Sequence, residues 1–153
     1  MIYQTLYPSP IGSLLLQATD EALTVLQFDG ILQGDEQVNS IVRSTVLQLD
    51  EYFARSRRHF DIPLSPEGTE FQQKVWKQLI TVEYGRQLSY LQLSKRLGNV
   101  LAIRAVANAN GKNPIPIMIP CHRVVGSKGD LIGFSGGLWR KQFLLELEGN
   151  RLF

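Results

Sequence analysis

The segment NPIPIMIPCHRVVG, residues 113–126, restricts the fold more than any other part of the chain. Its three prolines each fix a backbone φ angle and remove an amide donor, so this segment is unsuited to a helix interior or a central strand. It leads into Cys121, the chain's one cysteine, and His122 follows. A stiff connection can hold a nucleophile at a fixed angle, and a neighbouring base activates a thiol. The alternative is an inert buried cysteine, the commoner case.

The number of cysteines and the apolar content limit the classes of protein to which this chain can belong. One cysteine excludes an internal disulfide and supplies too few thiolates for a zinc site, so we expect a reduced, cytoplasmic protein without a metal. The 153 residues are 44% hydrophobic, which suits one domain or two small ones. No stretch approaches a membrane span, and the start MIYQTLYPSP lacks the features of a secretory signal.

Charge is divided unevenly along the chain. Residues 1–66 carry four basic and eight acidic side chains, whereas residues 67–153 carry twelve basic and six acidic ones. The net charges of these parts are therefore −4 and +6. A polyanion such as nucleic acid would favour the second part, although an ordinary solvated basic face would give the same count.

The hydrophobic pattern indicates an α+β protein with two domains, 1–66 and 67–153. Three β-leaning segments separated by turn residues favour a small antiparallel sheet at the start, over residues 3–7, 12–19 and 22–29. Apolar residues then recur at helical spacing over 38–55. Residues 55–68 contain two prolines and end on a glycine, so we expect a linker there.

The second domain is expected to be mainly helical. Thr69 with Gln72, and Ser89 with Gln92, have the spacing of a capping box, which predicts two helix starts. Five apolar residues are expected to form the buried face of the first of these helices: Phe71, Val75, Trp76, Leu79 and Ile80. A short helix after Ser89 and a third helix over 100–110, joined by a Gly-Asn turn, resemble a helix-turn-helix, although many helical bundles contain such a corner.

The third helix carries mostly small side chains around one long cation, Arg104. Small residues let a helix backbone approach a partner closely, and that partner is either a nucleic-acid groove or another helix. Arg104 would then reach a phosphate or wedge into a base stack, or simply extend into solvent.

The last predicted helix lies within residues 137–150. Leu144, Leu145 and Leu147 form its apolar face, so either Glu146 or Glu148 points inward. An inward carboxylate is the third group that a cysteine and histidine pair needs for orientation.

These motifs, taken together, resemble those of the O6-alkylguanine-DNA alkyltransferases. PCHRVVG, preceded by NPIPIMI and followed by GFSGGLWRK, is similar to the family's active-site signature. GTEFQQKVWKQL, YGRQLSY and RAVANANGKNP resemble its upstream blocks in order and spacing. The resemblance is strong over residues 68–149, whereas the first part resembles the family only in its length and β-rich start.

The resemblance implies direct DNA repair by a protein that acts once. The alkyl group on O6 of guanine, or on O4 of thymine, would move irreversibly from double-stranded DNA to the cysteine. It also implies a monomer that needs no cofactor, no metal and no protein partner. In this reading Cys121 is the acceptor, His122 the base acting through a water, and Glu148, rather than Glu146, the group that orients the histidine. Asn113 would hold the turn around the site, and Tyr90 would contact the flipped guanine.

The same resemblance implies two further sets of residues. The DNA-binding residues would be Arg104, which fills the gap left by the extruded base, together with Ser89, Ala105 and Asn110. The substrate pocket would be formed by Val124, Phe134, Ser135, Gly136 and Lys141. Arg123 would fix the helix and loop without taking part in the chemistry.

The sequence also departs from the family pattern in places. Val100, Ala107 and Phe134 stand where proline, glycine and tyrosine are common, and each would alter which alkyl adducts fit. Three other functions remain open: a damage-binding module, a helix-turn-helix regulator and a multiple-turnover thiol hydrolase. Cys121 argues against the first because relatives of that kind lack it, and no obvious second base supports the last.

Overall fold

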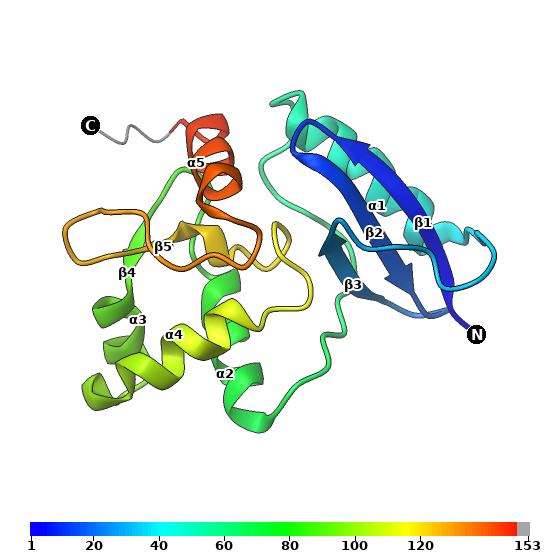
Figure 1. The fold of residues 1–153 in the computed structure, drawn as a ribbon. Coiled ribbons are helices and arrows are strands. Elements are labelled where there is room, and N and C mark those ends of the chain that lie inside the picture. Colours follow the sequence, from blue (N-terminus) through cyan, green and yellow to red (C-terminus); the bar gives the residue numbers. More distant parts are fainter. Residues whose placement is uncertain (150–153) are drawn as a thin grey trace. The chain divides into compact units, whose positions relative to one another are not determined.

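The computed structural model describes residues 1–149 and divides the chain into two compact units, Met1–Glu67 and Gly68 onward. The predicted α+β class is confirmed, because an antiparallel sheet forms in the first unit and helices dominate the second (Figure 1). Within residues 1–149, no helix has both the length and the apolar content to cross a bilayer.

The first unit is a three-stranded antiparallel sheet with one helix packed on it. The strands β1 (Tyr3–Ser9), β2 (Gly12–Ala18) and β3 (Leu23–Phe28) lie in sequence order, and α1 (Ser40–Phe53) contacts β1 and β2 (Figure 1). β2 is the central strand, and its three consecutive leucines are buried. The three predicted strands are therefore confirmed.

The helix predicted over 38–55 is α1, shortened at both ends by its caps. The side chain of Asn39 accepts a backbone amide of the first turn. After the helix, the amides of Arg55 and Ser56 donate to carbonyls of the last turn in the Schellman pattern. Arg55 has a φ of 64°, at the left-handed position where glycine is usual.

Replacing Arg55 with glycine is expected to raise the free energy of unfolding by up to about 1 kcal/mol. A residue with a side chain is strained in the left-handed region, and glycine removes that strain. The loss of the arginine charge near the helix C-terminus offsets about a few tenths of a kcal/mol of this gain. Urea denaturation measures the change. Arg55→Ala removes the same charge but keeps the left-handed cost, so it should not be more stable than the wild type. Equal gains in both variants would rule out the backbone explanation.

The second unit is helical, with one short parallel strand pair, β4 with β5. Its elements are α2 (Glu70–Ile80), β4 (Leu88–Ser89), α3 (Tyr90–Arg96), the 3-10 turn η1 (Val100–Ala102), α4 (Ile103–Gly111), the 3-10 turn η2 (Cys121–Arg123), β5 (Val124–Val125) and α5 (Leu138–Leu147). α4 packs against both α2 and α3 (Figure 1). The indole of Trp76 fixes α2 to α4 by donating to the carbonyl of Ala109 at 2.9 Å.

Two expectations for this unit are corrected. Val75, Trp76 and Leu79 of α2 are buried as predicted, but Phe71 and Ile80 are exposed. In a helix each residue turns by about 100°. Phe71 therefore lies roughly 40° outside one edge of the arc formed by the buried residues, and Ile80 lies roughly 40° outside the other edge. The third helix begins only at Ile103, because residues 100–102 form the 3-10 turn η1.

Candidate active site

Cys121 lies where the proline-containing segment enters the turn η2. The segment folds back around Asn113, whose amide nitrogen donates to the carbonyl of Ile119 at 2.7 Å. The carbonyl oxygen of the Asn113 side chain accepts from the amide of Ile115 at 2.9 Å. Ile117 has a φ of 76°, which is rare for a β-branched residue. Asn113 therefore stabilises a strained turn immediately before the cysteine.

A buried ion-pair network surrounds the residue after the cysteine. Nε2 of His122 lies 2.8 Å from one carboxylate oxygen of Glu148. Nε and Nη2 of Arg123 donate to the two oxygens of the same carboxylate at 2.9 Å each, and Nη1 donates to the carbonyl of Val82 at 2.7 Å. Of the two glutamates considered from the sequence, Glu148 points inward and Glu146 is exposed.

The network sets the protonation of the imidazole. Burial alone would raise the pKa of the Glu148 carboxyl, but the contacts with His122 and Arg123 hold this pKa well below its usual range. Burial lowers the pKa of His122, and the charges of Arg123 and Lys141 act in the same direction, against the raising effect of Glu148. An ionised carboxylate only accepts, so the hydrogen of neutral His122 lies on Nε2. Nδ1 is then a free acceptor, and it has no hydrogen-bond partner among residues 1–149.

The Cys121 thiol is neutral in this environment. Burial raises its pKa to about 11, against the opposing effects of the Asn113 amide and the Lys141 charge. The side chain is 4% exposed. Burial in turn lowers the pKa of Lys141 to about 8. The Lys141 charge lowers the thiol pKa but does not overcome burial, so the thiol does not ionise by itself at neutral pH and needs a base before it can react.

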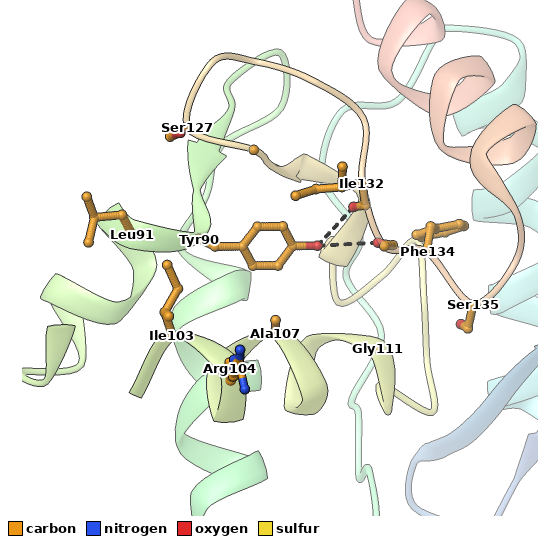
Figure 2. Close-up of a pocket in the computed structure, with 12 residues that line it drawn as sticks. Tyr90, Leu91, Ile103, Arg104, Ala107, Gly111, Ser127, Ile132, Phe134 and Ser135 are labelled. Atoms are coloured by element: carbon orange, nitrogen blue, oxygen red, sulfur yellow. Dashed lines mark hydrogen bonds between the residues drawn. The ribbon is translucent and has the colours of Figure 1, made fainter. Parts of the chain in front are cut away.

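A cavity of about 540 Å³ opens between α3, α4 and the loop before α5. Figure 2 shows Tyr90 in this cavity, with Ile103, Arg104 and Ala107 of α4 on one side and Ile132 of the loop on the other. Cys121 does not line the cavity. A thiolate at Cys121 is nonetheless close enough to Tyr90 to contribute, after burial, to the raised pKa of the tyrosine.

The loop before α5 is held against Tyr90 and Lys141. The tyrosine hydroxyl donates to the carbonyls of Ile132 at 3.1 Å and Gly133 at 3.3 Å (Figure 2). The Lys141 ammonium also donates to Ile132, at 2.8 Å, and lies 5.8 Å from the centre of the Tyr90 ring. Gly133 has a φ of 62°, and a side chain there would crowd the tyrosine hydroxyl.

The other predicted pocket residues divide into two groups. Phe134 and Ser135 line the cavity (Figure 2). Val124, Gly136 and Lys141 do not line it. Val124 is fully buried in β5, and Gly136 is buried with its carbonyl accepting from Arg140. These two belong to the scaffold around the pocket, and Lys141 supports its loop.

The predicted DNA-binding residues also separate. Arg104 and Ala105 are exposed on α4, where a duplex can reach them. The hydroxyl of Ser89 accepts from the amide of Gln92 at 3.0 Å and caps α3. Asn110 is only 2% exposed, and this burial argues against its predicted contact with DNA. Its amide donates to the carbonyl of Cys121 at 3.4 Å, because it lies on the inward face of α4.

Sequence reasoning missed three partners of the site. The carbonyls of Ile132 and Gly133 receive Tyr90, and the carbonyl of Val82 receives Arg123. Backbone carbonyls leave no mark in a sequence, so no residue pattern could have indicated them. Within residues 1–149, no group of three or more His, Cys, Asp or Glu side chains is arranged to hold a metal ion.

Two family models together match nearly all of the chain. The 6-O-methylguanine DNA methyltransferase DNA-binding domain matches residues 70–150, and the ribonuclease-like domain of the same methyltransferase matches residues 2–66. A methylated-DNA–protein-cysteine methyltransferase of Methanosarcina acetivorans is 40% identical, over 97% of this chain and 99% of the relative. One from Mycobacterium leprae is 44% identical, over 99% of this chain and 95% of the relative.

Solved structures agree with these sequence matches. The Mycobacterium tuberculosis O6-methylguanine methyltransferase has a TM-score of 0.87 at 41% identity, covering 97% of this chain and 93% of that one. The OGT of the same organism, solved in complex with DNA, has a TM-score of 0.85 at 42% identity, covering 96% of this chain and 91% of that one. Similarity of sequence and of fold thus extends over both units, and the chain belongs to the 6-O-methylguanine DNA methyltransferase family.

Proposed function

We propose that this protein repairs DNA directly by moving the alkyl group of O6-alkylguanine onto the sulfur of its own Cys121. The observation that carries the proposal is the neutral His122 next to the only cysteine, with Nε2 fixed by Glu148 and Nδ1 left free to accept a proton. The relatives named for methyl transfer to a protein cysteine support the same reaction. O4-alkylthymine carries the same kind of O-alkyl carbon and is the second proposed substrate.

The transfer forms a bond between the Cys121 sulfur and the alkyl carbon and breaks the bond between that carbon and O6. The bonding electrons stay on the departing guanine, and the thiol proton passes to Nδ1 of His122, directly or through a water. Because the resting thiol has a pKa of about 11, this base is required at neutral pH. A thioether does not hydrolyse readily, so each molecule acts once.

The substrate base must leave the duplex to meet a buried sulfur. The cavity of about 540 Å³ beside Tyr90 is the proposed receiving site, with Phe134 and Ser135 on its wall. Cys121 is 4% exposed, so the proposed reaction requires the surroundings of the sulfur to open, and we infer that the loop held by Tyr90 and Lys141 shifts to admit the base. The Tyr90 hydroxyl released by this shift can then donate to the guanine.

Arg104→Ala is expected to slow repair of O6-methylguanine in duplex DNA by about tenfold to a hundredfold, while reaction with free O6-benzylguanine changes little. Arg104 is exposed on α4 at the cavity edge, where it would replace the extruded base in the stack. The free base needs no such replacement. Single-turnover rates on the two substrates measure the difference, and equal losses would contradict this role.

Mass spectrometry tests the reaction itself. Incubation with an oligonucleotide containing O6-methylguanine should add one methyl mass to the protein, located on the peptide with Cys121. An unmodified protein, or a methyl group on another residue, would refute the proposal.

We propose that the protein acts as a monomer in a reducing compartment. The proposed catalytic, pocket and DNA-contacting residues all lie in the unit that begins at Gly68, which supports a monomer whose second domain both binds DNA and accepts the alkyl group. A reactive thiol keeps its reduced form in the cytoplasm, the location we propose.

A further inference from the structure

Leu101, in the turn η1, is the most exposed large apolar side chain in the part of the second unit that the structure describes, at 90% of its surface. A leucine left in water forgoes a burial free energy that a partner surface can recover. The leucine does not line the cavity, so accommodating a flipped base does not account for it.

The backbone of Leu101 is anchored, and its side chain lies on the same exposed face as Arg104. The side chain of Asn99 accepts the amide of Leu101 at 3.0 Å, which anchors the backbone of the turn. Leu101, Arg104, Ala105 and Asn108 are spaced as one helical face, and all four are exposed. The opposite face of α4 is buried.

The reach of this face fits a stacked duplex. Three residues of a 3-10 turn or helix rise about 4.5–6 Å, and neighbouring bases on one strand are about 3.4 Å apart. With the helix axis along the stack, Leu101 and Arg104 would meet base steps that are one or two positions apart. Apolar side chains inserted from the minor groove are a known means of unstacking and kinking DNA.

We propose that Leu101 is a second wedge, which enters the minor groove beside Arg104 and opens the base step next to the damaged position. This inference rests on the proposed function, because it assumes that α4 faces the duplex from which the base is extruded. Leu101 is a positioning residue here, since it acts on the DNA stack and touches neither the sulfur nor the alkyl carbon.

The test compares Leu101→Asn with Leu47→Asn, a control on α1 whose leucine is 60% exposed. Leu101→Asn should slow repair of duplex O6-methylguanine about tenfold and leave the reaction with free O6-benzylguanine unchanged. Leu47→Asn should change neither rate. Wild-type speed of Leu101→Asn on the duplex, or equal losses on both substrates, would overturn the wedge.

Fluorescence of 2-aminopurine beside the lesion gives a readout that a structural role of Leu101 would not produce. In a Cys121→Ser background, binding should raise the fluorescence of the probe, and Leu101→Asn should remove that rise while the protein remains bound. An unchanged rise would overturn the proposal. So would sedimentation showing that Leu101 joins two copies of the chain in the absence of DNA. Failure of the proposed function is distinguishable, because the wild type would then transfer no alkyl group from either substrate.

Discussion

Serine in place of Cys121 is expected to lower alkyl transfer by on the order of 10⁴-fold or more, while DNA binding is retained. An alcohol is far less acidic than a thiol and its oxygen is a weaker nucleophile towards an alkyl carbon, so His122 cannot compensate by accepting the proton. Binding should be retained because the exposed face of α4 contains no atom of the cysteine. A duplex labelled on the methyl carbon of O6-methylguanine measures transfer, and fluorescence anisotropy measures affinity.

Two controls make this result specific to the sulfur. Thermal unfolding should show that Cys121→Ser is folded, since serine is slightly smaller than the cysteine it replaces. Lys112→Ser, which changes an exposed residue just beyond α4, should transfer the methyl group normally. A Cys121→Ser protein that still removes the label from DNA would show that another residue is the acceptor.

Local sequence rules predicted where α2 and α3 begin. Both capping boxes are present, with Thr69 and Gln72 at the start of α2 and Ser89 and Gln92 at the start of α3. These devices depend on residues three positions apart, so a sequence displays them completely. The irregular course of the segment before Cys121 follows in the same way from the fixed φ angles of its prolines.

Contacts between residues that are far apart in the sequence could not be predicted from local patterns. Arg123 bonds to Val82, 41 positions earlier, and Asn110 turns inward to the carbonyl of Cys121. α4 carries small residues on both faces, so its periodicity did not indicate that Asn110 would be buried. The resemblance to a family favoured Glu148 over Glu146, a choice that helical spacing alone left open. The catalytic role of Glu148 stays a prediction until variants are measured.

Glu148→Leu is expected to lower the free energy of unfolding by about 3–5 kcal/mol and to slow transfer severely. Removing one partner of a buried ion pair leaves the other charge uncompensated, and here Arg123 would lose both carboxylate contacts. His122 would lose the acceptor that fixes its tautomer, so Nδ1 would no longer be reserved for the thiol proton. Urea denaturation and single-turnover transfer measure the two effects separately.

A double variant separates the structural effect from the effect on the base. Arg123→Met together with Glu148→Leu removes both charges, so it should recover part of the stability that Glu148→Leu loses. Transfer should stay slow in the double variant, because His122 still lacks its acceptor. Recovery of both stability and transfer would show that Glu148 serves only to neutralise Arg123.

The pH dependence of stability gives an independent check on the same carboxylate. The folded pKa of Glu148 lies below its unfolded value of about 4.3, so its contribution to stability is complete above that value and is lost as the pH falls. The wild type should therefore lose stability steeply between about pH 5 and pH 3. Glu148→Gln, which cannot ionise, should be less stable at pH 7 and should show a shallower loss over this range. Parallel curves for the two proteins, measured as urea midpoints, would mean that the ionised carboxylate does not contribute to the stability of the buried network.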